Sequence, residues 1–206
     1  LESQKTLFFR TRIINQTQAT NITANVTDAI GVSNVLVNVT SPYGQTSTFQ
    51  MIQSGTTWNY YYTTTLTTIP GSYTARIIAN DTSNNINSTE TTNFTVNDVT
   101  PPSVVNITPV SGSQYTQNTP VEIRANITDN INVSQVYVNV TMPNGTTTNL
   151  WLVASGNDTY NATFTQTGMS GNYTVRIIAN DTSNNINNTQ TTSFIITDLT
   201  KPSVTQ

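Results

Sequence analysis

The sequence contains two copies of one segment, separated by about 100 residues. IIANDTSNNIN occupies residues 77–87 and recurs unchanged at 177–187, and residues 21–40 resemble residues 122–141. Solenoid repeats have periods of about 20–50 residues, whereas a period near 100 matches the length of one small β-sandwich domain. The chain therefore consists of two copies of one domain in series. Serial duplication favours a protein that spans distance or presents a surface over a catalyst.

The hydrophobic pattern has a period of two along most of each copy. Residues 121–128, for example, place Val, Ile, Ala and Ile at alternate positions, with Glu, Arg, Asn and Thr between them. Such alternation is typical of β-strands with one buried and one exposed face, and no segment has a convincing 3.6-residue period. Together with the turn signals between the alternating segments, it predicts seven strands in the second copy, near residues 103–109, 121–128, 133–141, 146–153, 158–167, 172–180 and 188–197.

Seven short strands in about 100 residues predict an all-β fold of two tandem immunoglobulin-like or fibronectin-like β-sandwiches. The sequence has no Cys, so packing alone must hold the two sheets of each sandwich together. The expected core consists of aliphatic and aromatic residues at equivalent positions of the two copies. These are Ile22, Val26, Val35, Val37, Tyr73, Ile77 and Phe94, and Ile123, Ile127, Val136, Val138, Tyr173, Ile177 and Phe194.

The repeat boundaries predict a first sandwich at residues 1–99 and a second at 100–202. NDVTPPSV, at 97–104, recurs as TDLTKPSV at the end of the second copy. Proline fixes φ and favours extended backbone, so the linker should be short and stiff. Residues 203–206 correspond to the opening strand of a further module. We expect them either to begin a third repeat or to pair with a sheet of a neighbouring subunit.

The copies differ most at the N-terminus, residues 1–14. This segment contains KTLFFRTRII and lacks the PPSV that opens the second copy. It forms either the first strand of its own domain or a donor strand that completes a sheet of a neighbouring subunit. Head-to-tail contacts of the second kind generate open filaments.

Composition excludes some partners. Charged residues make up only 8% of the chain, against about 25% in a typical soluble protein, and 43 Thr and 28 Asn take their place. Seven Lys and Arg residues form no basic stripe, which argues against nucleic acid as a partner. No apolar run approaches the roughly 18 residues of a membrane span.

The candidate chemistry is N-glycosylation, because Asn-X-Ser/Thr sequons occur 17 times, about twice the number expected by chance from this composition. The sequon asparagines are Asn15, Asn21, Asn25, Asn38, Asn80, Asn87, Asn93, Asn106, Asn126, Asn132, Asn139, Asn144, Asn157, Asn161, Asn172, Asn180 and Asn187.

A compositional explanation of these sequons is also available. A solvent-exposed strand face made of Asn and Thr, with an apolar residue between them, produces the motif automatically, as at Asn126 and Asn139. That explanation does not account for the choice of Asn, which is disfavoured in strands. Covalent sugar would supply the hydration and edge protection that a charge-poor surface lacks, so we expect glycosylation at some but not all of the sequons.

The sequence resembles the tandem immunoglobulin-like repeats of archaeal cell-surface proteins. The resemblance is carried by IIANDTSNNIN, TTNFTVNDVTPPSV and ANITDNINVSQVYVNVTMPNGT, and it extends from about residue 20 to residue 206. It implies a secreted, heavily N-glycosylated protein of a surface filament, a pilus-like structure or an S-layer-associated stalk. By analogy with bacterial chaperone–usher pili, it also suggests subunits joined by donor-strand complementation.

Other activities find little support in the sequence. The chain has no His, no Cys and ten scattered carboxylates, so we expect no catalytic residues and no enzyme activity. Asp81 and Asp181 occupy identical ANDTSNN turns, where we expect them to accept backbone hydrogen bonds.

Calcium is the strongest metal alternative. Asp98 and Asp198 precede the linkers, and Asp28 and Asp129 end strands, but these acids are not clustered in sequence as calcium ligands usually are. We therefore expect no metal and no cofactor other than covalent glycans. A repeated Lys–Asn isopeptide bond is also disfavoured, because Lys5 and Lys201 are the only lysines.

The sequence therefore predicts an extracellular structural protein, an N-glycosylated subunit of a cell-surface filament or sheath whose partners are copies of itself or further repeats. The alternative is a pair of stalk repeats from a cell-surface adhesin whose binding head lies outside this chain. Because the sequence has no His, we also expect little change in folding stability between pH 5 and 8.

Overall fold

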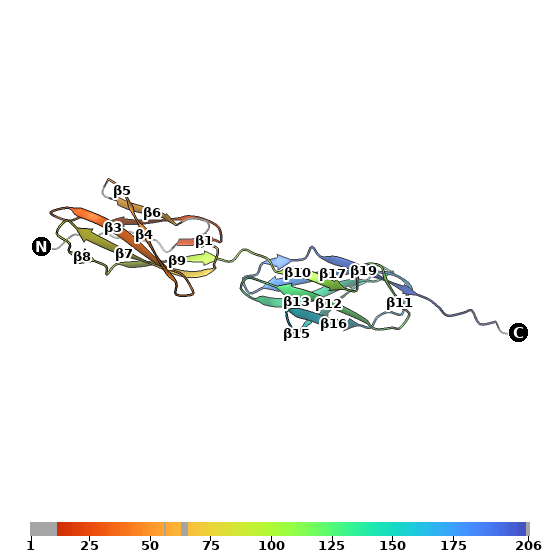
Figure 1. Cartoon of the computed structure of the whole chain (residues 1–206). Coiled ribbons are helices and arrows are strands. Elements are labelled where there is room, and N and C mark those ends of the chain that lie inside the picture. Colours follow the sequence, from red (N-terminus) through yellow and green to blue (C-terminus); the bar gives the residue numbers. More distant parts are fainter. Residues whose placement is uncertain (1–11, 56, 63–65, 205–206) are drawn as a thin grey trace. The chain divides into compact units, whose positions relative to one another are not determined.

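The structure is a computed structural model that describes residues 12–55, 57–62 and 66–204. The chain divides into two compact units, unit 1 at Leu1–Val99 and unit 2 at Thr100–Gln206. Every regular element in the described residues is a strand, and each unit contains two sheets (Figure 1). The predicted all-β fold of two tandem sandwiches is confirmed. Within the described ranges, no helix has the length and hydrophobicity needed to span a lipid bilayer.

Unit 1 has a six-stranded sheet, in the order β1-β9-β7-β3-β4 with β8 paired to β7, and a three-stranded sheet in the order β2-β6-β5. Strand β1 runs parallel to β9, and the other neighbouring strands are antiparallel. The strands are β1 (Arg12–Asn15), β2 (Thr20–Asn25), β3 (Val32–Thr40), β4 (Thr46–Gln50), β5 (Ile52–Ser54), β6 (Thr57–Tyr62), β7 (Gly71–Asp81), β8 (Ile86–Asn87) and β9 (Thr91–Asn97).

Unit 2 repeats this arrangement and has one strand more than the described part of unit 1. Its six-stranded sheet has the order β11-β19-β17-β13-β14 with β18 paired to β17, and its second sheet has the order β10-β12-β16-β15. The strands are β10 (Ser103–Thr108), β11 (Ser113–Thr116), β12 (Val121–Thr128), β13 (Val133–Thr141), β14 (Thr147–Trp151), β15 (Val153–Gly156), β16 (Thr159–Phe164), β17 (Gly171–Asp181), β18 (Ile186–Asn187) and β19 (Thr191–Thr197).

The single strand predicted at 146–153 is wrong, because the chain changes sheets within it. Strand β14 pairs with β13, whereas β15 pairs with β16 in the other sheet. Leu152 lies between the two strands with its side chain buried, and its backbone N–H donates to Val136 O at 3.0 Å. Met51 repeats this crossing in unit 1, where its N–H donates to Val35 O at 2.9 Å. A buried residue at the crossing continues the hydrophobic pattern, so the sequence reads as one strand.

The first predicted strand of unit 2 is also followed by one that the sequence did not predict. Strand β10 pairs antiparallel with β12, and β11 then pairs parallel with β19 in the opposite sheet. The Thr192 hydroxyl of β19 donates to Pro109 O at 2.6 Å, in the segment that connects β10 to β11. Residues 110–119 are rich in turn-forming residues, which conceals the four-residue strand within them.

The predicted core is confirmed at every position except Val26, which is half-buried. Tyr73 stacks on Phe94, and Tyr173 stacks on Phe194, each with ring centroids 4.9 Å apart. The hydroxyl of Tyr173 donates to Met169 O at 2.9 Å, a backbone contact that fixes the corner before β17. The sequence prediction omitted several residues that complete the two cores. They include Met51, Trp58, Tyr62, Leu152 and Phe164.

Part of the predicted donor segment lies in its own unit. Arg12, Ile13 and Ile14 form most of β1, which pairs with Phe94–Val96 of β9. The rest of the segment, residues 1–11, lies outside the described residues. The tail after β19 has no strand partner among the described residues, and Leu199 and Val204 are 74% and 92% exposed.

Candidate functional site

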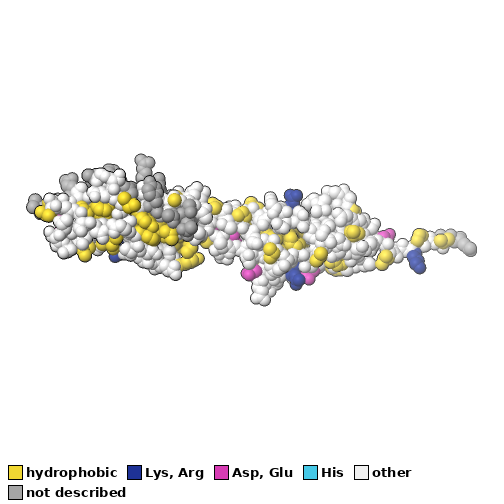
Figure 2. All heavy atoms as spheres, turned by 45° about the horizontal axis from the view of Figure 1, so that its top comes forward, with side chains coloured by type: hydrophobic (Ala, Val, Ile, Leu, Met, Phe, Trp, Pro, Cys, Tyr) yellow, Lys and Arg dark blue, Asp and Glu magenta, His cyan; other side chains and the backbone are white. Residues whose placement is uncertain are grey.

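All 17 sequon asparagines lie within the described residues, and none of them is buried. The outer strand faces around them consist mainly of uncharged polar side chains, and Figure 2 shows few charged groups on the face that it presents. Seven of the asparagines are exposed and the other ten are half-buried. The exposed group is Asn15, Asn93, Asn106, Asn132, Asn144, Asn157 and Asn172.

Three sequons form a local turn in which the motif's own threonine bonds to its asparagine. In Asn144-Gly145-Thr146, the Asn144 Oδ1 accepts the Thr146 N–H at 3.0 Å and the Thr146 hydroxyl at 2.7 Å. Asn87 and Asn187 form the same turn with the threonines two residues ahead. The hydroxyl and the amide of the sequon are therefore already paired, which is an Asx-turn geometry.

Other sequon amides are engaged through the nitrogen to which a sugar would be attached. Asn126 Nδ2 donates to Thr159 Oγ1 at 3.1 Å, and Asn161 Nδ2 donates to Glu122 Oε1 at 3.3 Å. Asn187 Nδ2 donates to Pro102 O at 2.9 Å in a half-buried position. These contacts would compete with modification, and sequence motifs alone did not distinguish these positions from open ones.

Two equivalent sequons lie on the outer faces of the six-stranded sheets. Asn38 of β3 accepts the Thr48 hydroxyl at 2.8 Å through Oδ1. Asn139 of β13 is opposite Asn149 instead, and its Oδ1 is buried without a hydrogen-bond partner. In Asn139 the atom that is buried without a partner is therefore the acceptor oxygen of the amide.

Asp81 and Asp181 have the structural role that was predicted for them. Asp81 Oδ1 accepts the N–H groups of Ser83 and Asn85, each at 2.8 Å, and Oδ2 accepts Asn85 Nδ2 at 2.7 Å. The hydrogen bonds from Asn85 hold the pKa of the Asp81 carboxyl below its ordinary value. Asp181 makes the same contacts in unit 2.

The aspartates considered as calcium ligands mostly serve local turns. Asp28 Oδ1 accepts the N–H groups of Ile30 and Gly31, and Asp198 Oδ1 accepts the Thr200 N–H. In unit 2, carboxylate oxygens of Asp129 and Asp181 lie within 4.8 Å of each other.

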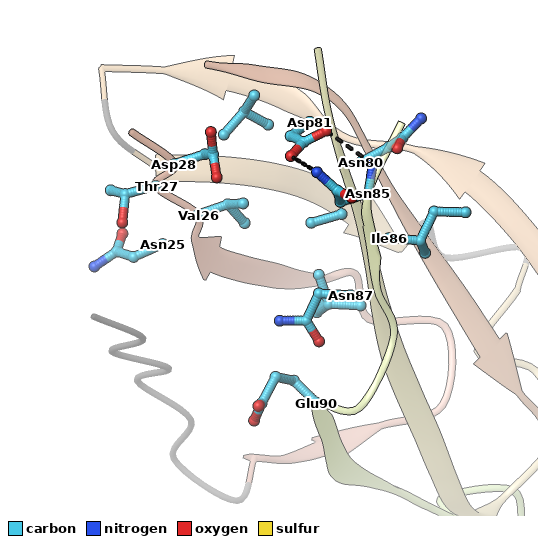
Figure 3. Close-up of a pocket in the computed structure, with 13 residues that line it drawn as sticks. Asn25, Val26, Thr27, Asp28, Asn80, Asp81, Asn85, Ile86, Asn87 and Glu90 are labelled. Atoms are coloured by element: carbon cyan, nitrogen blue, oxygen red, sulfur yellow. Dashed lines mark hydrogen bonds between the residues drawn. The ribbon is translucent and has the colours of Figure 1, made fainter. Parts of the chain in front are cut away.

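Unit 1 contains a hollow of about 170 Å³ beside the end of β2 and the turn after β7. Figure 3 shows Asn25, Val26 and Asp28 on one side of it and Asn85, Asn87 and Glu90 on the other. Its lining combines aliphatic groups with carboxamides and carboxylates. We call it the unit 1 hollow.

The corresponding part of unit 2 is covered by the start of β10. Pro102 and Val104 are buried there, and Val104 is opposite Ile127 of β12. Asn187, the counterpart of Asn87, binds the carbonyl of Pro102. Among the described residues, unit 1 has no counterpart of β10, and β2 is the edge of its sheet. Sequence reasoning missed the hollow, because the hydrophobic pattern does not show where a covering strand lies.

Comparison with known proteins supports the fold. A model of the bacterial Ig domain family matches residues 102–177. A solved tetra-tandem repeat from the extending region of a large adhesion protein is 17% identical, with a TM-score of 0.50, over 89% of this chain and 46% of that chain. The titin I-band fragment I67–I69 is 13% identical, with a TM-score of 0.50, over 92% of this chain and 62% of that one.

The chain is thus a tandem pair of immunoglobulin-like β-sandwiches, a class of structural and binding modules. It spans less than two thirds of the length of each of these two solved chains. A search of curated proteins gave no match.

Proposed function

We propose that this chain is an N-glycosylated structural protein of the cell surface, a subunit of an extracellular filament or sheath that assembles head to tail. The observation that carries the proposal is the placement of all 17 sequon asparagines at or near the solvent on two repeated sandwiches. In this proposal the paired strands bear load, and sugars hydrate the surface. Its partners are copies of the same chain, and no catalytic residue, metal or nucleic acid is involved.

The charge-poor surface supports the glycan component. Edge strands such as β5 and β15 have exposed backbone groups that pair readily with other chains, and proteins usually protect such edges with charged residues. Here the outward side chains are mainly Thr, Ser and Asn, which form ladders such as the contact between Thr40 and Thr46 at 2.9 Å. A bulky, hydrated sugar would provide the missing protection.

Intact mass measurement and glycopeptide mapping of the native protein test this component. We expect sugar at the exposed Asn144 and Asn172, and lower occupancy at Asn187, whose Nδ2 is engaged with Pro102 O. Native protein with all 17 asparagines unmodified would refute the glycan component.

The assembly component is supported by a comparison of the described residues of the two units. The β2 edge and the unit 1 hollow lie where β10 covers unit 2, and KPSV at 201–204 repeats the PPSV that opens β10. We propose that this tail of one subunit pairs with β2 of the next, as β10 pairs with β12. Val204 would then enter the position that Val104 fills in unit 2, where Val104 is only 6% exposed.

The N-terminal residues 1–11 are the other candidate occupant of this edge. They belong either to their own unit or to a neighbour, as was expected from the sequence. An offset of 101 residues relates β1 to β11, and the same offset relates residues 2–7 to β10. Residues 2–7 therefore have the position in the repeat from which β10 pairs with the edge strand.

Substitution of Val204 distinguishes the two candidates. Val204→Asp should abolish polymerisation without affecting folding, because Val204 is 92% exposed in the free chain and burying a carboxylate in an apolar site is costly. Ser203→Asp is the matched control and should polymerise, because Ser103 is exposed in β10. Size-exclusion profiles and electron micrographs report the outcome. Normal filaments from Val204→Asp combined with loss of filaments after deletion of residues 1–11 would assign the donor strand to the N-terminus.

A stalk of a surface adhesin is the second candidate function. It is favoured by the fold match to the extending region of a large adhesion protein, which shares the tandem arrangement of sandwiches. A monodisperse native protein that attaches to cells or glycans through another domain would support this alternative over the filament.

A further inference from the structure

The outer face of the six-stranded sheet in unit 2 carries an aromatic pair. Tyr137 of β13 lies directly opposite Trp151 of β14, with ring centroids 5.3 Å apart and planes at 58°. Trp151 is 60% exposed, whereas Ile178, which lies opposite Tyr137 on the same face, is buried. An exposed indole is an apolar surface with a hydrogen-bond donor, the kind of group that contacts amphipathic ligands.

The sequon asparagine Asn139 is the next residue on this face. Side chains alternate along a strand, so Asn139 projects on the same side as Tyr137, two residues earlier. Asn139 Oδ1 is buried without a hydrogen-bond partner among the described residues, and the side chain as a whole is half-buried. The residue to which a sugar would be joined therefore lies next to the aromatic pair.

A polar hollow lies on the other side of Asn139. Arg176 of β17 is opposite Asn139 in the register of the sheet. The hollow has a volume of about 280 Å³, and threonines from four strands line it together with Arg176. Its lining residues are Asn139, Thr141, Thr147, Thr174, Arg176 and Thr191.

We propose that the first sugars of an N-glycan on Asn139 pack against Tyr137 and Trp151, with their hydroxyl groups directed to Arg176 and the threonines of this hollow. A pyranose ring has C–H groups on its faces and hydroxyl groups at its rim, so it matches an aromatic wall beside a polar hollow. The proposal rests on the N-glycosylation proposed above and assigns a binding site to one of its glycans. Tyr137 and Trp151, which we call the platform, thus hold a glycan of the chain itself against the sheet.

Unit 1 provides an internal control for this proposal. Its equivalent sequon Asn38 and the opposing Arg76 are retained, but Leu36 and Gln50 stand in place of Tyr137 and Trp151. Asn38 Oδ1 is also occupied by the Thr48 hydroxyl. A sugar on Asn38 would therefore have the polar neighbours without the aromatic wall, and we expect it to be mobile.

Glycopeptide mapping first establishes whether Asn139 carries sugar in the native glycoprotein. NMR of that glycoprotein then reports ring-current shifts of the sugar protons. We expect upfield shifts for the first sugar on Asn139, their loss in Tyr137→Leu/Trp151→Gln, and no such shifts for the sugar on Asn38. The replacement residues are those of unit 1, which the same fold accommodates.

A double-mutant cycle, measured by melting temperature, separates sugar packing from the structural role of the aromatic pair. Asn139→Gln should lower the melting temperature by about 4 °C when the aromatic pair is present and by about 1 °C or less in Tyr137→Leu/Trp151→Gln. An equal loss in both backgrounds, together with unshifted sugar protons, would overturn the inference. The proposed glycosylation would stand in that case.

Three further outcomes would also overturn the inference. An unmodified Asn139 in a protein glycosylated elsewhere would exclude this site alone, whereas a chain without any sugar would refute both proposals. Saturable quenching of Trp151 fluorescence, when a soluble chito-oligosaccharide is titrated into the chain lacking sugar at Asn139, would assign the platform to external carbohydrate instead.

Discussion

At the scale of single residues, two glycines set the start of the longest strand in each unit. Gly71 and Gly171 have φ values of +128° and +133°, which L-residues rarely adopt. A Cβ on Gly171 would also lie 2.9 Å from the ring atoms of Pro143, and Pro42 has the same relation to Gly71. The turn before each of these strands therefore requires the absence of a side chain, for conformational and steric reasons together.

We predict that Gly171→Ala destabilises unit 2 by about 2 kcal/mol, because the substitution adds backbone strain and a contact with Pro143. Hydrogen exchange of the β17 amides, measured by mass spectrometry, reports the loss within unit 2. Gly168→Ala is the control, since its φ is not in the positive range and its Cβ would lie 3.5 Å from Asn118 Oδ1. Equal protection in both variants would contradict the argument.

At the scale of elements, the short strand β11 depends on one buried side chain. Thr192 of β19 is 7% exposed, and its hydroxyl donates to Pro109 O at 2.6 Å. The Gly112 N–H donates to Ser193 O at 3.0 Å next to it. These contacts hold the chain where it crosses from the sheet of β10 to the sheet of β19.

Thr192→Val should destabilise unit 2 by about 1–3 kcal/mol, because it leaves the Pro109 carbonyl without its partner at almost constant side-chain volume. Within the described part of the chain the counterpart Thr92 makes no such bond, so Thr92→Val should change stability by about 0.5 kcal/mol or less. Urea denaturation of both variants provides the comparison. A larger loss for Thr92→Val would show that shape, not the hydroxyl, controls this position.

The strands that could be predicted are those buried on one face along their whole length. Alternation located β12, β13 and β17 to within a residue or two. It failed at Leu152 and at β11, where the chain changes sheets, because the pattern does not encode which sheet a strand joins. The sequons were readable directly from the sequence. The Tyr137–Trp151 platform was not, because it depends on the register between two strands.

At the scale of the whole molecule, titration is confined to the extremes of pH. The chain has no His, so few groups change charge between pH 5 and 8. Burial, followed by the proximity of Tyr73 and Tyr60, raises the pKa of Tyr62 to about 12. Burial also raises the pKa of Tyr173 in unit 2.

We predict that stability is nearly constant from pH 5 to 8 and decreases above about pH 10. A tyrosine whose folded pKa is raised stabilises the fold below its unfolded pKa of about 10, and this contribution is lost as the pH rises through the folded value. The lowered pKa of Asp81 has the opposite sign, so its contribution is lost as the pH falls below about 4. Urea melts across the pH range test this, and a steep loss between pH 6 and 7.5 would contradict it.

The position of β10 has a consequence for how such a chain could lengthen during evolution. Strand β10, which covers the edge of β12 in unit 2, begins directly after Pro101 and Pro102 of the linker. A gene duplication that copies about 100 codons together with this linker therefore also copies the strand that covers the sheet edge. The added module then needs no newly evolved interface. Length can then change by whole modules while every inserted sandwich remains closed.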